Sequence, residues 1–396
     1  MTNETKAGSD TSLWNGDFTL LFFGNFFMYL SSIMIMPVLP LYLSQVGGNN
    51  FQIGLIMGCF TLSAILIRLF AVKITGWLGG MLFLMTGLIT CGLAACGYYI
   101  TAIISLLFLF RVLHGFGFGS STTMFSAMVS NIIPKDRMGE GMGFFSLGIV
   151  TATAIGPFIG TTITLMHNYQ WIFLLSSGLI LVSMLLTVLS KACRGNEDMA
   201  RGASLRISIS DFFEKRALFP SSLAFFMGFA MAGFFTFMVL FGNEAGLEKG
   251  VGAFFLIMSV AEFLIRFISG KLYDRKGSFV VLVPGIIACL AGTVLLGCSR
   301  NMPLFMASSI FIGIGMGMIF PVLQGWALKF TEPNRRVAAN ATFFNFLDGG
   351  MATGAIILGI IAEASSYSLM YLYSSISFGL LLILYLVRHA KTRQGE

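Results

Sequence analysis

Residues 111–119 read RVLHGFGFG, and residues 309–317 read SIFIGIGMG, 198 positions later in a chain of 396 residues. Three glycines match between the two stretches, namely Gly115, Gly117 and Gly119 with Gly313, Gly315 and Gly317. Both stretches lie within apolar runs that are long enough to cross a membrane as a helix. A match of three equally spaced glycines is much rarer by chance than a match of single leucines in so apolar a sequence, so the pair indicates an internal repeat of membrane helices.

Other uncommon residues align under the same shift of 198 positions. The matched sets are Ile67-Arg68 with Ile265-Arg266, Lys73 with Lys271, Gly79 with Gly277, Gly156 with Gly354, and Ser176-Ser177 with Ser374-Ser375. Two parallel repeats related about the membrane normal are an architecture of transporters, in which the substrate site lies between the halves near the midplane. We interpret the matched arginines, Arg68 and Arg266, as architectural residues.

Hydropathy predicts twelve membrane spans, because a helix needs about 20 apolar residues to cross the hydrocarbon. The predicted spans are 18–43, 52–72, 81–99, 103–126, 141–165, 170–190, 217–242, 251–272, 279–298, 303–328, 338–361 and 367–388. These runs are continuously apolar and too long for β-spans of about 10 alternating residues, which argues against a barrel. The predicted fold is an all-α integral membrane protein whose twelve transmembrane helices form two pseudo-symmetric six-helix bundles.

The longest polar stretch inside the chain separates the two predicted bundles. Residues 191–216 form a predicted cytoplasmic linker between an N-terminal bundle at 1–190 and a C-terminal bundle at 217–396. Among the Lys and Arg residues outside the spans, only Lys249 and Arg300 fall on the side opposite the linker. By the positive-inside rule this asymmetry predicts that both termini lie in the cytoplasm, and we expect the chain in a cell inner membrane.

The composition excludes several classes of protein. Hydrophobic residues make up 56% of the chain and charged residues only 10%, against roughly 25% charged in a typical soluble domain. A soluble enzyme, a disordered protein and a nucleic-acid binder are therefore excluded, and the net charge of +7 reflects loop orientation. The six cysteines form no CxxC motif, so we expect buried free thiols and no metal site or cofactor.

A loop after the eighth predicted span carries a recognisable motif. Residues 270–277 read GKLYDRKG, in which Gly270 and Gly277 permit a tight turn and Asp274 and Arg275 can answer helix termini. The segment resembles the signature loop of the major facilitator superfamily, and the resemblance implies that these four residues act in gating. The matched loop of the first half, at 72–79, reads VKITGWLG and lacks the charged pair.

Two further motifs resemble those of the twelve-span drug:proton antiporters within that superfamily. The first span contains Leu30-Ser31 followed by Pro37-Val38-Leu39-Pro40, and the fifth contains Gly143, Ala152, Gly156-Pro157 and Gly160. Small residues let helices approach closely and proline bends them, which would let the fifth span rock against its neighbours. The alternative interpretation is the glycine-rich packing of any transporter.

The fourth span contains Arg111, followed by His114 three positions later on the same helix face. A permanently charged guanidinium inside a span must face a cavity or a partner. The family resemblance associates this arginine with proton coupling, so both residues are candidates for coupling and Arg111 also for substrate contact. The alternative is that Arg111 only braces neighbouring helices.

Two acids lie near the middle of predicted spans, Glu262 in the eighth and Asp348 in the eleventh. An ionised carboxylate at the bilayer centre costs roughly 2.5–3.5 kcal/mol on insertion scales, so each is a candidate proton carrier. The repeat places Ala64 and Val150 at the matched positions, so the six-helix unit folds without either acid. Glu262 has Arg266 four residues later, which makes a structural ion pair an equal alternative; Asp348 ranks first because its own helix offers no partner.

Aromatic and Met-rich stretches in the first and seventh spans favour a bulky or amphipathic organic substrate over a small ion. In the family, spans 1, 4, 7 and 10 line the centre. The candidate substrate contacts are therefore Asn25, Tyr29, Arg111, Phe226, Phe229, Gln324 and Asp348.

The sequence thus predicts a monomeric secondary transporter that exports an organic solute in exchange for protons by alternating access. No phosphate-binding loop or nucleophile triad occurs, so neither ATP hydrolysis nor another enzyme activity is expected. The predicted partners are a small organic molecule, protons and the bilayer, with no nucleic acid. Two alternatives remain, a proton-coupled or facilitative nutrient importer and a non-transporting membrane receptor.

Overall fold

A computed structural model describes residues 13–134, 137–166, 168–191, 214–329, 331–332 and 336–394. Within these residues, twelve segments are long and apolar enough to cross a membrane, which confirms the predicted all-α fold. The long helices are α1 (Gly16–Ile35), α2 (Val38–Gln45), α3 (Asn50–Leu78), α4 (Gly80–Ile100), α5 (Ile104–Ile132), α6 (Met138–Met166), α7 (Tyr169–Leu189), α8 (Leu218–Glu244), α9 (Val251–Lys276), α10 (Phe279–Gly297), α11 (Met302–Lys329), α12 (Arg336–Ala364) and α13 (Tyr367–Gln394).

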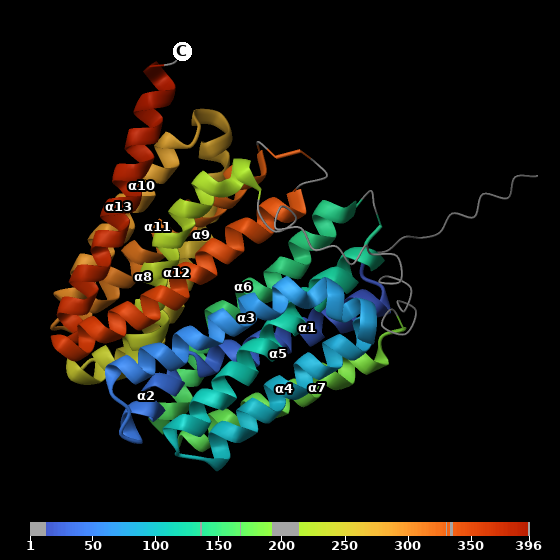
Figure 1. Ribbon diagram of the computed structural model, residues 1–396. Coiled ribbons are helices and arrows are strands. Elements are labelled where there is room, and N and C mark those ends of the chain that lie inside the picture. Colours follow the sequence, from blue (N-terminus) through green and yellow to red (C-terminus); the bar gives the residue numbers. More distant parts are fainter. Residues whose placement is uncertain are drawn as a thin grey trace, which may run out of the picture.

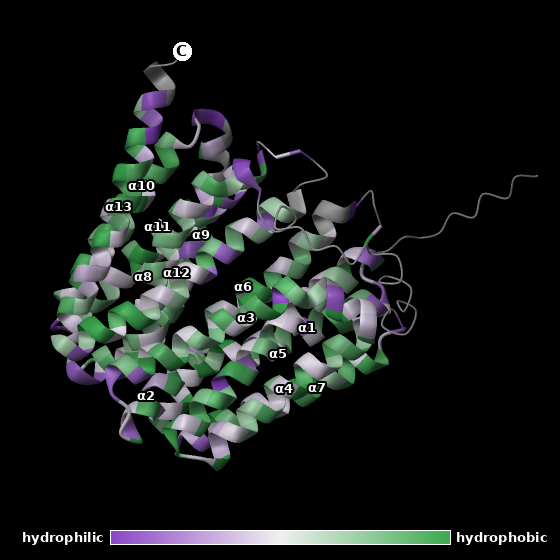
Figure 2. Cartoon of the chain, viewed as in Figure 1, coloured by the Kyte–Doolittle hydropathy of each residue, from purple (hydrophilic) through white to green (hydrophobic). Residues whose placement is uncertain are grey.

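The helices form two groups, α1 to α7 and α8 to α13, which face one another along α3 with α12 and along α6 with α9 (Figure 1). We call the face where α1 and α8 begin and α7 and α13 end the linker face, and the opposite face the far face. Hydrophobic residues cover the flanks of the helices, and hydrophilic ones gather towards these two faces (Figure 2). Residues 192–213, most of the predicted linker, lie outside the described residues.

The twelve predicted spans agree with the structure, and three details of the helices differ from expectation. The first span is divided into α1 and α2 at Met36 and Pro37, because proline cannot continue the backbone hydrogen bonding. The two loops that we expected after the second and eighth spans are instead helical, and α3 and α9 end only at Leu78 and Lys276. The turn itself lies at the next residue of each, Gly79 with φ 80° and Gly277 with φ 79°, a conformation that favours glycine.

The repeat extends to individual backbone contacts. A Cβ on Gly115 would lie 2.2 Å from the carbonyl oxygen of Phe60, and one on the matched Gly313 would lie 2.2 Å from that of Met258, itself the match of Phe60. The other two glycines of each triplet likewise meet matched backbone atoms at 2.5–2.6 Å. The triplets lie on α5 and α11, which are the fourth spans of the two halves. They let each of these helices approach two neighbouring helices more closely than any side chain would permit.

The cysteines partly follow expectation. The five cysteines among the described residues are free thiols. Cys91 and the matched Cys289 are buried, and each thiol lies 3.8 Å from a matched carbonyl oxygen. Cys96 and Cys298 are exposed, so the expectation of burial was wrong for these two, and Cys59 is half-buried.

The two groups of helices touch most closely at the far face. The Asn50 backbone N–H donates to Glu363 Oε2 over 2.7 Å, and the Tyr367 hydroxyl donates to Asn50 Oδ1 over 2.5 Å. One turn deeper, a Cβ on Gly54 would lie 2.2 Å from the carbonyl oxygen of Ala355. From there α3 and α12 diverge towards the linker face (Figure 1), so the structure is closed at the far face.

Candidate functional site

An ion pair joins the two groups of helices where α3 and α12 begin to separate. Arg68 Nη1 of α3 lies 2.5 Å from Asp348 Oδ2 of α12, and the two side chains are 25% and 18% exposed. Helical side chains lean towards the N-terminus of their helix, so Arg68 reaches back towards the far face to meet Asp348. Two charges inside membrane spans thus neutralise one another while they keep contact with solvent.

Tyr29 of α1 completes this cluster. It is half-buried, and its hydroxyl lies close enough to interact electrostatically with both Arg68 and Asp348. Its ring packs edge-on against Phe118 of α5, with 5.2 Å between centroids. The structure thus brings together two predicted site residues, Tyr29 and Asp348, with Arg68, a residue that we had set aside as architectural.

That interpretation of Arg68 was incomplete, because the repeat match concealed its partner. Arg68 has the matched Arg266 in the second half, but Asp348 is matched by Val150 in the first. The signal that could have identified the pair is this mismatch. Arg68 and Arg266 match one another in the repeat, but Asp348 has no acidic match. One arginine therefore has an acidic partner in the opposite half, and the other does not.

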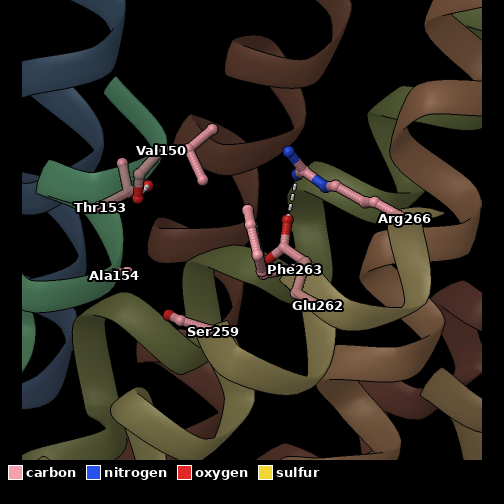
Figure 3. A pocket seen from close by; sticks show the side chains of 7 residues that line it. All are labelled: Val150, Thr153, Ala154, Ser259, Glu262, Phe263 and Arg266. Carbon is pink, nitrogen blue, oxygen red and sulfur yellow. Dashed lines mark hydrogen bonds and ion pairs between the residues drawn. The ribbon is translucent and has the colours of Figure 1, made fainter. Parts of the chain in front are cut away.

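Glu262 pairs with Arg266 on its own helix, as the structural alternative had it. The pair lies at the second contact between the halves, where α9 faces α6. A small cavity of about 40 Å³ opens beside it (Figure 3), lined by Val150, Thr153, Ala154, Ser259, Glu262, Phe263 and Arg266. Organic ligands of drug size need roughly 300–1,000 Å³, so this cavity takes a single functional group or water rather than a whole substrate.

Arg111 and His114 lie inside the first bundle, sealed from solvent at 0% and 1% exposure. The His114 ring nitrogens lie 3.2 Å from the Tyr98 hydroxyl and 3.3 Å from Ser32 Oγ. The Arg111 guanidinium stacks 4.1 Å from the centre of the Phe60 ring. None of its nitrogens has an acceptor of good geometry among the described residues, although Tyr98 interacts with its charge.

A row of ring contacts links this buried cluster to the ion pair. Phe118 touches Tyr29 at 5.2 Å and Phe60 at 5.3 Å, and Phe60 touches His114 at 5.3 Å. The charges on α3 and α5 are therefore separated by packed aromatic side chains and not by open space. Arg111 is therefore enclosed within the first bundle, whereas Tyr29 is half-buried beside the Arg68–Asp348 pair.

The remaining candidate substrate contacts are scattered. Asn25 is buried, and neither atom of its amide has a hydrogen-bond partner among the described residues. Gln324 of α11 donates to Asn340 Oδ1 of α12 over 3.0 Å. Phe226 and Phe229 are half-buried on α8. No pocket described here gathers these four side chains.

The candidate gating residues lie at two places. Gly270 and Asp274 lie within α9, and the Asp274 side chain falls outside the described residues. Arg275 is exposed, and Gly277 forms the turn after α9. Gly156 packs against α1, where its Cβ would lie 3.1 Å from Ile33, and Pro157 lies within α6. Among the described residues, no group of His, Cys, Asp and Glu is arranged to hold a metal ion.

Comparison with known proteins agrees with this architecture. The sequence profile of the Major Facilitator Superfamily matches residues 21–301 and 280–396. An MFS-type transporter of Methanocaldococcus jannaschii is 24% identical over 86% of this chain and 90% of its own. The multi-drug resistance efflux pump PmrA of Streptococcus pneumoniae is 25% identical over 87% of this chain and 90% of its own. The crystal structure of the nucleoside transporter NupG superposes with a TM-score of 0.69, covering 93% of this chain and 98% of that one at 14% identity.

Proposed function

The chain belongs to the major facilitator superfamily of membrane transporters, and we propose that it exports a bulky or amphipathic organic solute across the cytoplasmic membrane in exchange for protons. The similarity to a multi-drug efflux pump over most of both chains supports export. The excess of basic residues in loops on the linker side supports a cytoplasmic linker face. Closure at the far face then makes the described conformation an inward-facing one, open to a substrate from the cytoplasm.

The Arg68–Asp348 pair is the observation that carries proton coupling. It is an ion pair between the two halves, so its strength depends on how far apart they stand. Arg68 stabilises the ionised carboxylate of Asp348. Protonated Asp348 carries no charge and therefore does not attract Arg68. The two side chains are 25% and 18% exposed, and in the proposed cycle protons and substrate reach them from the linker face.

Alternating access then follows from two exclusive states of this carboxyl group. In the proposed cycle Asp348 takes a proton from outside as substrate leaves. The two halves then return from the outward-facing to the inward-facing arrangement. Asp348 releases the proton towards the cytoplasm, where Arg68 stabilises the carboxylate and substrate enters. Tyr29, which interacts with both charges, is the hydrogen-bonding group that a substrate meets beside them.

Asp348→Asn tests the assignment in proteoliposomes with an imposed proton gradient. The amide keeps the size of the side chain but cannot carry the proton, so we expect gradient-driven transport to be lost while the protein still purifies in folded form. The matched control is Glu244→Gln, which makes the same acid-to-amide change at an exposed position at the end of α8. Full proton-driven transport by the Asp348 variant would overturn the proposal.

The direction of proton flux separates export from import. In vesicles with a known orientation, addition of substrate on the linker side should move protons towards that side if the two fluxes are opposed. Proton movement together with the substrate would instead indicate a symporter.

A further inference from the structure

The start of helix α3 is capped in part by the opposite half of the protein. Within its own half, the Asn49 side chain accepts a hydrogen bond from the Gln52 backbone N–H, in a capping box. The Asn50 N–H, at the first position of the helix, instead donates over 2.7 Å to Oε2 of Glu363, near the end of α12. A carboxylate at a helix N-terminus is stabilising because it meets unpaired N–H groups and the positive end of the helix dipole.

The matched helix of the second half begins differently. Under the shift of 198 positions, Asn50 matches Glu248 and Glu363 matches Leu165. Glu248 lies in the short 3₁₀ helix Glu248–Gly250 directly before α9, so this helix start carries an acid of its own half. Leu165 of α6 is apolar and 51% exposed. Of the two helix starts, the α3 start is therefore the one that receives its carboxylate from the other half.

The hydrogen bond between Asn50 and Glu363 belongs to the closed far face. Gly359 lies one turn before Glu363, where a Cβ would lie 2.6 Å from the Asn50 carbonyl oxygen, so the end of α12 touches the start of α3. When the far face opens, the end of α12 leaves the start of α3 and this bond is lost. Glu363 is exposed in the closed state, so protons reach its carboxylate from the far side without crossing the membrane.

Few titratable or charged groups surround this carboxylate. On α13, Tyr367 interacts electrostatically with Glu363 and donates over 2.5 Å to the Asn50 side chain. On α8, the exposed Glu244 interacts with the same tyrosine. The first turn of α3 contains no acid, and no basic side chain among the described residues forms an ion pair with Glu363. The positive group that the ionised carboxylate meets is therefore the N-terminus of α3.

We propose that Glu363 senses protons at the outer face, and that its ionised form stabilises closure by capping α3 from the opposite half. The ionised carboxylate accepts the Asn50 hydrogen bond and is attracted to the helix N-terminus, whereas the protonated group has lost that charge. Closure is therefore favoured at high outer pH and weakened as the outer pH falls. In the proposed exchange, outer acid then favours opening on the side where Asp348 takes up its proton.

This role differs from that of a proton carrier. Glu363 lies at the far face, so it exchanges its proton with the outer solution and carries none across the membrane. The inference adds a regulation to the proposed function, and it rests on that function for one point, that the far face is the outer face.

A pair of spin labels on the far face measures its opening. The labels are attached to Ser44→Cys of α2 and Ser365→Cys after α12, both exposed positions, in the full-length protein in lipid nanodiscs with its native cysteines replaced. We expect the fraction with a widened far face to rise between about pH 7.5 and about pH 4.5, a range that spans the titration of a glutamate side chain. Glu363→Gln should raise the ratio of open to closed protein about two- to fivefold at the higher pH and should respond less to acid.

Glu248→Gln is the matched control, because it makes the same change at the matched helix start without touching the bond between the halves. It should keep the native distances and the native pH dependence. Any part of the response that arises at Asp348 is present in both variants, so the difference between them reports Glu363.

Two substitutions of Asn50 separate its backbone contact from its side-chain contact. Asn50→Pro removes the N–H donor but keeps the helix start, since proline is favoured at the first helical position and Asn49 already has the extended conformation that precedes proline. Asn50→Ala keeps the N–H and removes the side chain that Tyr367 contacts. We expect the proline variant to respond to acid as weakly as Glu363→Gln, and the alanine variant to keep the native response.

Either of two results would overturn the inference. One is a native far face that does not widen in acid, and the other is a response to acid that is as large in Glu363→Gln and Asn50→Pro as in Glu248→Gln. Because label distances are measured without transport, such failure is distinct from failure of the Asp348→Asn experiment. Proton-driven export that depends on Asp348 would then stand without regulation at the far face.

Discussion

At the scale of the residue, Asp348 is tolerated in a membrane span because Arg68, 280 positions earlier in the chain, lies within hydrogen-bonding distance. Neither charge is stable there alone, since removal of one partner of a buried pair leaves the other uncompensated. The pair is only partly buried, with exposures of 25% and 18%, so solvent weakens this penalty without abolishing it.

A double-mutant cycle measures that dependence. Arg68→Gln leaves the Asp348 carboxylate unpaired and should lower the thermal stability in detergent, by the equivalent of about 1–3 kcal/mol. Adding Asp348→Asn removes the stranded charge, so the double variant should regain most of the loss. A double variant as unstable as the sum of the single ones would show that the two residues do not interact.

The sequence identified Asp348 as a candidate but not its partner. The insertion cost of a carboxylate depends only on its place in the span, which hydropathy reveals. The partner depends on which helices of the two halves face one another and how deep Arg68 lies, and no local pattern contains that information. The same limit explains why Arg111 was correctly placed inside a span while its enclosure against Phe60 was not foreseen.

At the scale of the element, glycine spacing determines how closely the helices pack. A Cβ on Gly115 or Gly313 would lie 2.2 Å from a backbone carbonyl oxygen of the neighbouring helix, which a real side chain cannot do. The glycine triplets were visible in the sequence, and they are the reason why the fold was predictable. Helix ends were less predictable, because α3 and α9 continue through 73–78 and 271–276, where charged residues and glycines indicated loops.

Alanine substitutions of helical glycines should therefore differ sharply. Gly115→Ala forces α3 and α5 apart and should destabilise the protein by about 1–3 kcal/mol, as overpacking does. Gly178 lies in a helix with nothing within 4 Å of its Cβ position, so Gly178→Ala should be neutral or slightly stabilising. Thermal unfolding of the two variants side by side is the measurement, and equal behaviour would contradict the packing argument.

At the scale of the whole molecule, two contacts between the halves decide which face is open. The far face is held by two hydrogen bonds, one from the Asn50 backbone N–H to the Glu363 carboxylate and one from the Tyr367 hydroxyl to the Asn50 side-chain oxygen. If transport requires this face to open, a bridge across it must stop the cycle.

A reducible bifunctional thiol reagent applied to an Asn50→Cys, Glu363→Cys variant, with the native cysteines replaced, provides that bridge. We expect transport in proteoliposomes to fall to background after crosslinking and to recover on reduction. The control is the same reagent on the variant with only one of the two cysteines. Transport at the native rate while crosslinked would show that the far face need not open.

The contact between α3 and α12 and the contact between α6 and α9 also differ in which atoms meet. A Cβ on Gly54 of α3 would lie 2.2 Å from backbone on α12, whereas one on the matched Gly252 of α9 would lie 2.9 Å from the hydroxyl of the Thr161 side chain on α6. Side chains can change rotamer and backbone cannot. The contact between α3 and α12 is therefore stiffer than the contact between α6 and α9. When the halves rearrange, the contact between α3 and α12 should therefore change less than the contact between α6 and α9.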